Sequence, residues 1–439
     1  MKVNFYVLMA MSLTITQIHS DEPSDVKPSN TDEVVVTASI LNPSRIINPV
    51  YVIDGDEIED NATTSLGEAV DSYLGVSIAD YGAAVGQPII RGMSGPRVKV
   101  LKNGMVNRDV SGLGADHLND IDLNNLEQVE IVKGPSSLLY ANGTSGGIIN
   151  VVDNCIAPED FSTQEFIAGL ETQSVNDGDS EYFNFKDNVN GFNVNIGYKK
   201  SEFGNFDIPD DAVMHDEGHE GHDEHEKELS YLENSDLAIE STKFGISRTG
   251  EWGYLGVSVD NHESMYGIPY HGEHADEDGH DDHDDHADED GHDDHADDDH
   301  DDHDEHEGER IFSTTDQESF TIRGLYNVNG SLINSVTYNY RDTEYSLIEA
   351  HAEEEGHDDH ADEDEHEPTV FSNDATEYGA IFDLSTDNLI QKIALNFVDE
   401  DSSIVGEEKF MNPANNEEFT LGYFLSADLD MFYLDAGFR

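Results

Sequence analysis

The sequence has few basic residues, one cysteine and no long apolar run. Its 439 residues contain 21 Lys and Arg against 96 Asp and Glu, a formal charge of −75. A chain this acidic cannot neutralise phosphates, which excludes nucleic-acid binding. The single Cys155 excludes an internal disulfide and any cysteine-based zinc or redox centre. No stretch has the ~20 apolar residues of a membrane-spanning helix. The small partners that this composition favours are cations.

The first twenty residues have the features of an export signal. Lys2 gives a positive start, residues 5–18 are mostly apolar, and His19-Ser20 closes the segment. A buried N-terminal helix would also be apolar, but residues 21–30 are polar and linker-like. We therefore predict a signal peptide at 1–20 and an exported protein.

Residues 77–153 have the composition of a small α/β domain, with short apolar runs between Gly- and Asn-rich turns. Apolar residues at helical spacing predict a helix over 63–74, with Thr63 or Thr64 as its N-cap. The sequence has no GxSxG, no HExxH and no phosphate-cradling loop. We predict that the protein is not an enzyme.

After Pro158 the chain becomes a series of segments with alternating polarity. Residues 192–200, 252–261 and 331–343 each put apolar side chains on one strand face and polar side chains on the other. This pattern is typical of a transmembrane β-barrel, although the strands of a soluble β-sandwich alternate in the same way.

The lengths of the connections favour the barrel. We predict eleven strands, with tight links such as Asn190-Gly191 alternating with long links from the second strand onward. In an antiparallel barrel this places the tight turns on one side of the membrane and the long loops on the other. The long links that carry His and acidic residues are 201–237, 262–317 and 344–374.

Three runs of histidine and acid lie in those links, at 215–228, 271–309 and 351–367, and they contain 18 of the 21 histidines. Imidazole with carboxylate suits Zn²⁺, Ni²⁺ or Cu²⁺. A merely solvated acidic loop would explain the charge but not the regular histidines, so we predict metal capture. The predicted ligands are His215, His219, His222, His225, His271, His274, His280, His283, His286, His292, His295, His300, His303, His306, His351, His357, His360 and His366.

One further pair of metal-ligating residues, Asp116-His117, lies in a region of ordinary composition (GLGADHLND). Taken alone, an Asp-His pair at a surface is more often a structural contact than a ligand pair. Outside the runs and the predicted signal, His262 is the other histidine of the chain.

Three segments resemble the TonB-dependent receptor family. Residues 32–38 (DEVVVTA) are similar to a TonB box, made of Asp32, Glu33, Val34, Val35, Val36, Thr37 and Ala38. Residues 87–104 (QPIIRGMSGPRVKVLKNG) and 127–152 (EQVEIVKGPSSLLYANGTSGGIINVV) resemble the family's plug signature.

The resemblance implies an α/β plug domain followed by an antiparallel transmembrane β-barrel, of 22 strands in the family and about 11 here. It divides the chain into a signal peptide (1–20), a TonB box and linker (21–45), a plug domain (46–155) and a partial barrel (156–439). Because half a barrel would expose an unpaired edge to lipid, we expect the sequence to be a fragment.

Within the family, the zinc-uptake (ZnuD-like) branch is the nearest resemblance. That branch has an Asp-His pair ahead of the EQVEI segment, matched by Asp116 and His117, and a His-rich loop after a Tyr-Gly-Ile-Pro segment, matched at 266–271. It also uses a Glu and a His from the barrel. Glu344 is our candidate for the Glu, and we expect the His to lie beyond Arg439.

The resemblance implies TonB-dependent uptake of zinc, or of Ni²⁺ or Cu²⁺, across the outer membrane of a Gram-negative bacterium. The metal is cargo, and we expect no cofactor. The expected partners are the TonB complex of the inner membrane and outer-membrane lipid, for a monomeric receptor. The alternatives are a surface metal buffer without transport and a receptor for haem, a siderophore or cobalamin.

Overall fold

The computed structural model describes residues 50–60, 65–81, 84–114, 116–209, 230–269, 310–328, 330, 332–352, 367–386, 388–406, 409–429 and 431–439. All of them belong to one compact unit, residues 37–439. The predicted signal peptide, the TonB box and nearly all of the three histidine runs lie outside the described residues. Among the described residues, no helix has the length and hydropathy needed to cross a bilayer.

The N-terminal part is a small domain around a five-stranded sheet, ordered β1-β6-β7-β4-β5. Its strands are β1 (Val50–Asp54), β4 (Val98–Lys102), β5 (Met105–Val106), β6 (Leu126–Val132) and β7 (Gly147–Asp153). Around it lie helices α1 (Gly55–Asp60) and α2 (Leu66–Val70), the hairpin β2 (Val76–Tyr81) and β3 (Val85–Ile90), and two 3₁₀ turns, Gly95–Arg97 and Pro135–Leu139. We call this domain the plug.

The plug's helix α2 differs from its prediction. It is shorter than the predicted span 63–74, and its N-cap is Ser65 rather than Thr63 or Thr64. The Ser65 side chain accepts a hydrogen bond from the backbone N–H of Glu68 at 3.2 Å. Three adjacent Ser/Thr residues are equivalent in sequence, so only the local backbone selects the one that caps.

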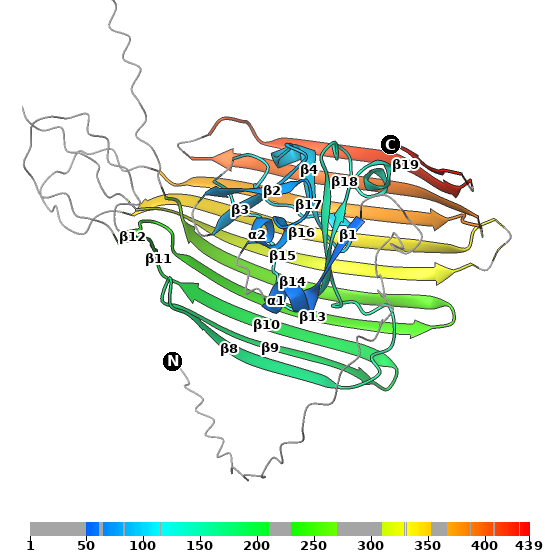
Figure 1. Cartoon of the computed structure of the whole chain (residues 1–439), viewed down its shortest axis with the longest axis horizontal. Coiled ribbons are helices and arrows are strands. Elements are labelled where there is room, and N and C mark those ends of the chain that lie inside the picture. The colour runs from blue at the N-terminus through cyan, green and yellow to red at the C-terminus, as the bar shows by residue number, and fades with distance from the viewer. Residues whose placement is uncertain are drawn as a thin grey trace, which may run out of the picture. The chain divides into compact units, whose positions relative to one another are not determined.

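The rest of the chain forms an eleven-stranded antiparallel sheet, drawn from green at β8 to red at the last strand in Figure 1. Its strands are β8 (Glu165–Gln173), β9 (Gly178–Val189), β10 (Phe192–Phe203), β13 (Leu237–Gly250), β14 (Gly253–Gly267), β15 (Arg310–Asn327), β16 (Ser335–Ala352), β17 (Thr369–Asp383), β18 (Leu389–Val405), β19 (Ala414–Asp428) and β20 (Tyr433–Phe438). A separate two-stranded sheet, β11 (Phe206–Asp207) and β12 (Tyr231–Leu232), follows β10 and precedes β13 along the chain. The predicted eleven strands are confirmed.

The links differ from the sequence prediction in length. β14 continues to Gly267, β15 starts at Arg310 and β16 continues to Ala352, so the ends of the predicted links 262–317 and 344–374 are strand. These strand ends are rich in polar residues, which the sequence pattern does not separate from a loop. The tight turn at Asn190-Gly191 is as predicted, with both residues at positive φ (55° and 81°), as a two-residue hairpin requires.

The large sheet has one apolar and one polar face. On β14, Leu255 and Val259 are exposed, whereas Ser258, Asp260 and His262 on the other face are buried. The polar face is buried because the plug packs against it. Lys102 of β4 donates to Asp260 at 2.7 Å, and Lys243 of β13 lies 2.8 Å from Asp122 of the plug. The exposed apolar face fits a lipid environment, as in a transmembrane barrel.

Apolar contacts also join the plug to the sheet. Val85 and Leu118 of the plug share one buried cluster with Tyr266, Tyr345 and Phe371 of the sheet. Cys155 follows β7, the last strand of the plug, and is buried against β13. A side chain at Gly245 would collide with the Cys155 backbone, so this glycine permits the close approach of the two segments.

Candidate metal-binding site between the plug and the sheet

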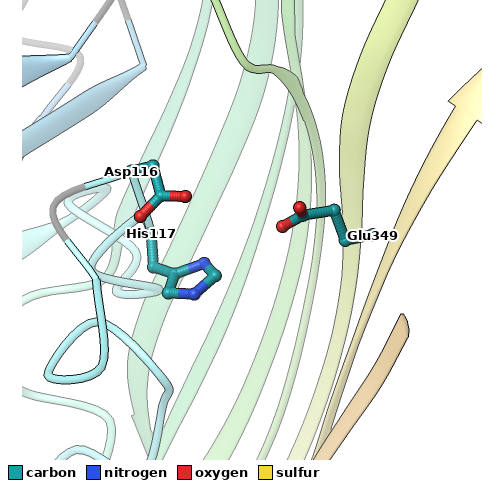
Figure 2. Close-up of side chains that lie close together, drawn as sticks. All are labelled: Asp116, His117 and Glu349. Carbon is teal, nitrogen blue, oxygen red and sulfur yellow. The ribbon is translucent and has the colours of Figure 1, made fainter. Parts of the chain in front are cut away.

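Asp116, His117 and Glu349 form the one group of three or more metal-ligating side chains found among the described residues. One ligand atom from each lies within 4.8 Å of the others. The first two come from the plug segment between β5 and β6, and Glu349 comes from β16, near its end at Ala352. Figure 2 shows the carboxylate of Glu349 directed toward the pair. His117 and Glu349 are each 5% exposed, and Asp116 is half-buried.

The plug side of this site is held by Gln87 of β3. Its side-chain amide donates to the backbone carbonyls of Ser111 (2.7 Å), Gly114 (2.6 Å) and His117 (3.0 Å). Gln87 is 6% exposed. One buried amide therefore fixes the path of the segment that carries Asp116 and His117. A Cβ at Gly114 would lie 2.2 Å from the Asp116 carboxylate, so a side chain there would displace this carboxylate from its present position.

The sheet holds the same segment from the other side. The Phe371 ring meets the edge of His117, with centroids 5.3 Å apart and planes at 69°. The backbone N–H of Leu118 donates to the Tyr266 hydroxyl at 3.4 Å. These contacts orient the imidazole before any ion arrives.

This ligand set suits a borderline divalent metal. Imidazole and carboxylate are both zinc ligands, and a site with three protein ligands leaves a fourth position open for water or another ligand. Ligand atoms on one tetrahedral zinc lie about 3.4 Å apart, given metal–ligand bonds of about 2.1 Å. Small side-chain movements would close the present 4.8 Å group onto an ion. The group contains no soft sulfur ligand, which Cu(I) prefers.

Three residues after His117, Asp120 joins the plug to the strands β14, β15 and β16. Its carboxylate accepts hydrogen bonds from Tyr345 (2.7 Å), Ser264 (3.0 Å) and Thr315 (3.1 Å). Burial, and next the charge of Asp109, raise the pKa of Asp120 to about 7 in spite of these donors.

Two residues further on, Asp122 has the opposite environment. Burial disfavours its charge, but the ammonium of Lys243 at 2.8 Å outweighs burial and lowers the pKa of Asp122 below its ordinary value. The two neighbouring acids therefore differ because one meets hydroxyls and the other meets a lysine.

The predicted site residues divide into three groups. Asp116 and His117 lie together and with a barrel Glu, but that Glu is not Glu344. Glu344 is exposed on the apolar face of β16, while Glu349 is buried on the face toward the plug. The side chains of the predicted run ligands, His351 of β16 included, lie outside the described residues.

A signal for Glu349 was present in the sequence. The alternation of β16 puts even-numbered residues such as Tyr338 and Tyr340 on the apolar face, and Glu344 falls in that set. Odd-numbered residues face the plug, and Glu349 is the acidic residue among them from Ser335 to Ala350. His262 and Asp120 also lie between the plug and the sheet, and they were not predicted as site residues.

The model of the TonB-dependent receptor plug domain matches residues 42–148. Residues 42–148 therefore form a plug domain of the TonB-dependent receptor type. The matched residues include both the Gln87 side chain that holds segment 111–117 and the Asp116-His117 pair of this chain.

Two relatives of this chain are vitamin B12 transporters named BtuB. That of Vibrio vulnificus is 26% identical over 219 residues, which cover 49% of this chain and 34% of that protein. That of Photobacterium profundum is 28% identical over 128 residues, which cover 28% of this chain and 21% of that protein. The alignments thus cover about a third or less of each relative's length.

Solved structures share the fold of this chain. The copper transporter OprC matches with a TM-score of 0.58 at 13% identity, over 88% of this chain and 54% of that one. The FrpB iron transporter of Neisseria meningitidis matches with a TM-score of 0.59 at 11% identity, over 88% of this chain and 58% of that one. The chain therefore spans little more than half the length of these structures.

Proposed function

We propose that this receptor takes up zinc, or a similar divalent transition metal, across the outer membrane in a TonB-dependent manner. The observation that carries the proposal is the buried group of Asp116, His117 and Glu349, contributed jointly by plug and sheet. A group shared between the two parts is sensitive to any movement of one against the other. That is what a carrier site needs, since it must release what it binds.

The parts of the chain act in sequence under this proposal. Two of the three His/acid runs connect β14 to β15 and β16 to β17, at the strand ends nearest Glu349. Their negative charge raises the local concentration of cations. The ion then passes to the group of three, and movement of the plug, driven by TonB at residues 32–38, separates the ligands. Neutral imidazole is the ligand, so loading weakens in acid.

Cobalamin is the second candidate cargo, and the identity with two vitamin B12 transporters favours it. The named cargoes of the structural neighbours also include haem, iron and copper. Against a bulky chelate stands the size of the group, whose ligand atoms lie within 4.8 Å of one another. Such a group fits a bare ion.

The test compares two Glu→Gln variants of one strand, in cells expressing the full-length receptor. Glu349→Gln removes a proposed ligand and should lower uptake of radioactive zinc by at least about tenfold at limiting zinc. Glu344→Gln is the matched control, since it lies five residues away on the exposed face. Its uptake should equal that of the wild type.

Equal uptake by both variants and the wild type would refute the ion site. Cobalamin uptake lost in Glu349→Gln, with zinc uptake unaffected, would favour the second candidate. Deletion of residues 32–38 separates transport from buffering, because it should abolish uptake and leave zinc binding at the cell surface intact. Unchanged uptake after this deletion would contradict TonB dependence.

A further inference from the structure

His262 is a buried histidine that none of the preceding interactions explains. It lies on β14, is 6% exposed and faces the plug. Its Nδ1 is buried with no hydrogen-bond partner among the described residues, and its Nε2 stops 3.8 Å from Oδ1 of Asp120, beyond hydrogen-bond distance. A buried polar atom left unpaired is destabilising, so the interactions within the fold do not account for this imidazole.

Among the described residues, two of the three acids around His262 are paired with a lysine, and the third, Asp120, is not. The imidazole lines a small polar pocket together with Asp120, Asp122, Asp260, Lys102 and Lys243. Lys102 pairs with Asp260 at 2.7 Å, and Lys243 pairs with Asp122 at 2.8 Å. Among the described residues, the partners of the Asp120 carboxylate are three hydroxyls and the imidazole of His262.

The strand register places His262 four residues further along the strands than the group of Asp116, His117 and Glu349. Glu349 pairs with Ser313, which pairs with Tyr266, and these residues form one row across β16, β15 and β14. Tyr345, Gln317 and His262 form a second row in the same way. The rows are four residues apart, about 13 Å along a strand.

Two plug residues occur along the chain in the same order as the rows that they approach. His117 belongs to the first group, and Asp120, three residues later, reaches the second row through Tyr345. The second row lies further from the His/acid runs than the first.

We propose that His262 and Asp120 form a second station for the transported divalent ion, which receives it from Asp116, His117 and Glu349. This inference rests on the proposed function. The distance of 3.8 Å between Nε2 and Oδ1 is close to the roughly 3.4 Å expected for two ligands of one tetrahedral ion. The hydroxyls of Ser264 and Thr315 fix the carboxylate from behind, as outer-shell donors do at metal sites.

The second station is weaker than the first, because two protein ligands replace three. Weak binding suits its position, since an ion held there is more easily released onward. The two lysines of the pocket are paired with carboxylates, so the Asp120 carboxylate is the one acid left there to attract the ion. A station of this kind affects the rate of passage more than the capture of the ion.

The experiment locates zinc directly in crystals of the full-length receptor soaked in Zn²⁺, by anomalous scattering at the zinc edge. This method separates the interior from any zinc on the histidine runs. We expect one peak among Asp116, His117 and Glu349, and a weaker peak between His262 and Asp120. His262→Gln should remove the second peak and keep the first, whereas Glu349→Gln should remove the first and keep the second.

Failure of the two proposals looks different in this experiment. A first peak without a second one overturns the station and leaves the proposed function standing. A second peak without the first supports the station and contradicts the proposed entry site. A second peak that survives in His262→Gln also overturns the assignment.

Uptake kinetics provide the second measurement, in case a variant packs poorly. His262→Gln and the near-isosteric Asp120→Asn should each lower the maximal rate of zinc uptake by about tenfold, with little change in the half-saturating concentration. Ser241→Ala is the matched control, because Ser241 lines the same pocket without a ligand role. Variants that change only the half-saturating concentration, or not at all, would refute the station.

Discussion

Asp120 and Asp122 lie two residues apart on one plug segment, and both are buried against the sheet, yet they belong to different kinds of region. Asp120 accepts hydrogen bonds from three hydroxyls and faces His262. Asp122 is paired with Lys243 at 2.8 Å. We call the surroundings of Asp122, together with the Lys102–Asp260 pair, the docking region. The surroundings of Asp116, His117, Asp120 and Glu349 form the ligand region.

Under the proposed function, this difference lets one interface both hold the plug and accept a cation. In the docking region a lysine supplies the positive charge permanently, so each acid stabilises the plug against the sheet. In the ligand region hydroxyls and imidazole surround the acids. An ion can supply the charge there and then depart. The distribution of lysines, rather than of acids, separates the two regions.

Breaking the docking region should have the largest effect. Lys243→Ala leaves Asp122 as a buried, unpaired charge, which should lower the free energy of plug unfolding by about 3–5 kcal/mol. Urea-dependent proteolysis of the purified full-length receptor measures this loss. The surface pair Lys200–Glu202 is the control, and Lys200→Ala should change nothing measurable. A double variant, Lys243→Ala with Asp122→Ala, should recover part of the loss, and no recovery would mean that the pair is not coupled.

The ligand region should respond to pH in the way set by Asp120. Its folded pKa of about 7 lies above the ordinary 3.8, so the folded state retains a proton that the unfolded chain releases. The stability from this group is therefore complete below pH 3.8 and is lost as pH rises toward 7, by at most roughly 4 kcal/mol.

Asp120→Asn removes this titration and should flatten the curve of stability against pH over that interval. The check is the difference in unfolding free energy between the variant and the wild type, measured without metal from pH 4 to pH 7.5. We expect the variant to gain on the wild type as pH rises. A constant difference would show that Asp120 keeps an ordinary pKa in the fold.

The smallest effect should come from the clamp behind the ligand region. Gln87→Ala removes three hydrogen bonds to the segment 111–117, which should cost about 1–3 kcal/mol of plug stability. It should also weaken zinc binding by about tenfold, because Asp116 and His117 lose their fixed geometry. Calorimetry with a zinc chelator as competitor measures the affinity. An unchanged affinity with reduced stability would confine Gln87 to a structural role.

The strands could be predicted from sequence because period-two alternation and turn residues are local signals. Asn190-Gly191 specifies a hairpin by itself, since both residues tolerate positive φ. The strand ends could not be predicted in the same way. Residues 310–317 and 344–352 continue their strands by pairing with each other, and a polar sequence does not report that pairing.

The candidate site was likewise predictable only where its residues are neighbours in the sequence. Asp116 and His117 are adjacent in sequence, so their pairing needed no fold. The structure does not bring Glu344 to the Asp116-His117 pair, because Glu344 lies on the exposed face of β16, as the alternation of that strand indicates. Asp120 could not have been assigned at all, since its donors Ser264, Thr315 and Tyr345 lie 144, 195 and 225 residues away along the chain.

The burial of Cys155 gives the molecule a built-in reporter. This thiol is the only one in the sequence, it is 4% exposed, and it lies where the plug passes into the sheet against Gly245. Burial raises its pKa, which suppresses the reactive thiolate further. Any displacement of the plug that opens this junction exposes a single unmodified sulfur to water. The alkylation rate of Cys155 therefore reports how often this junction opens, without an added label or a changed residue.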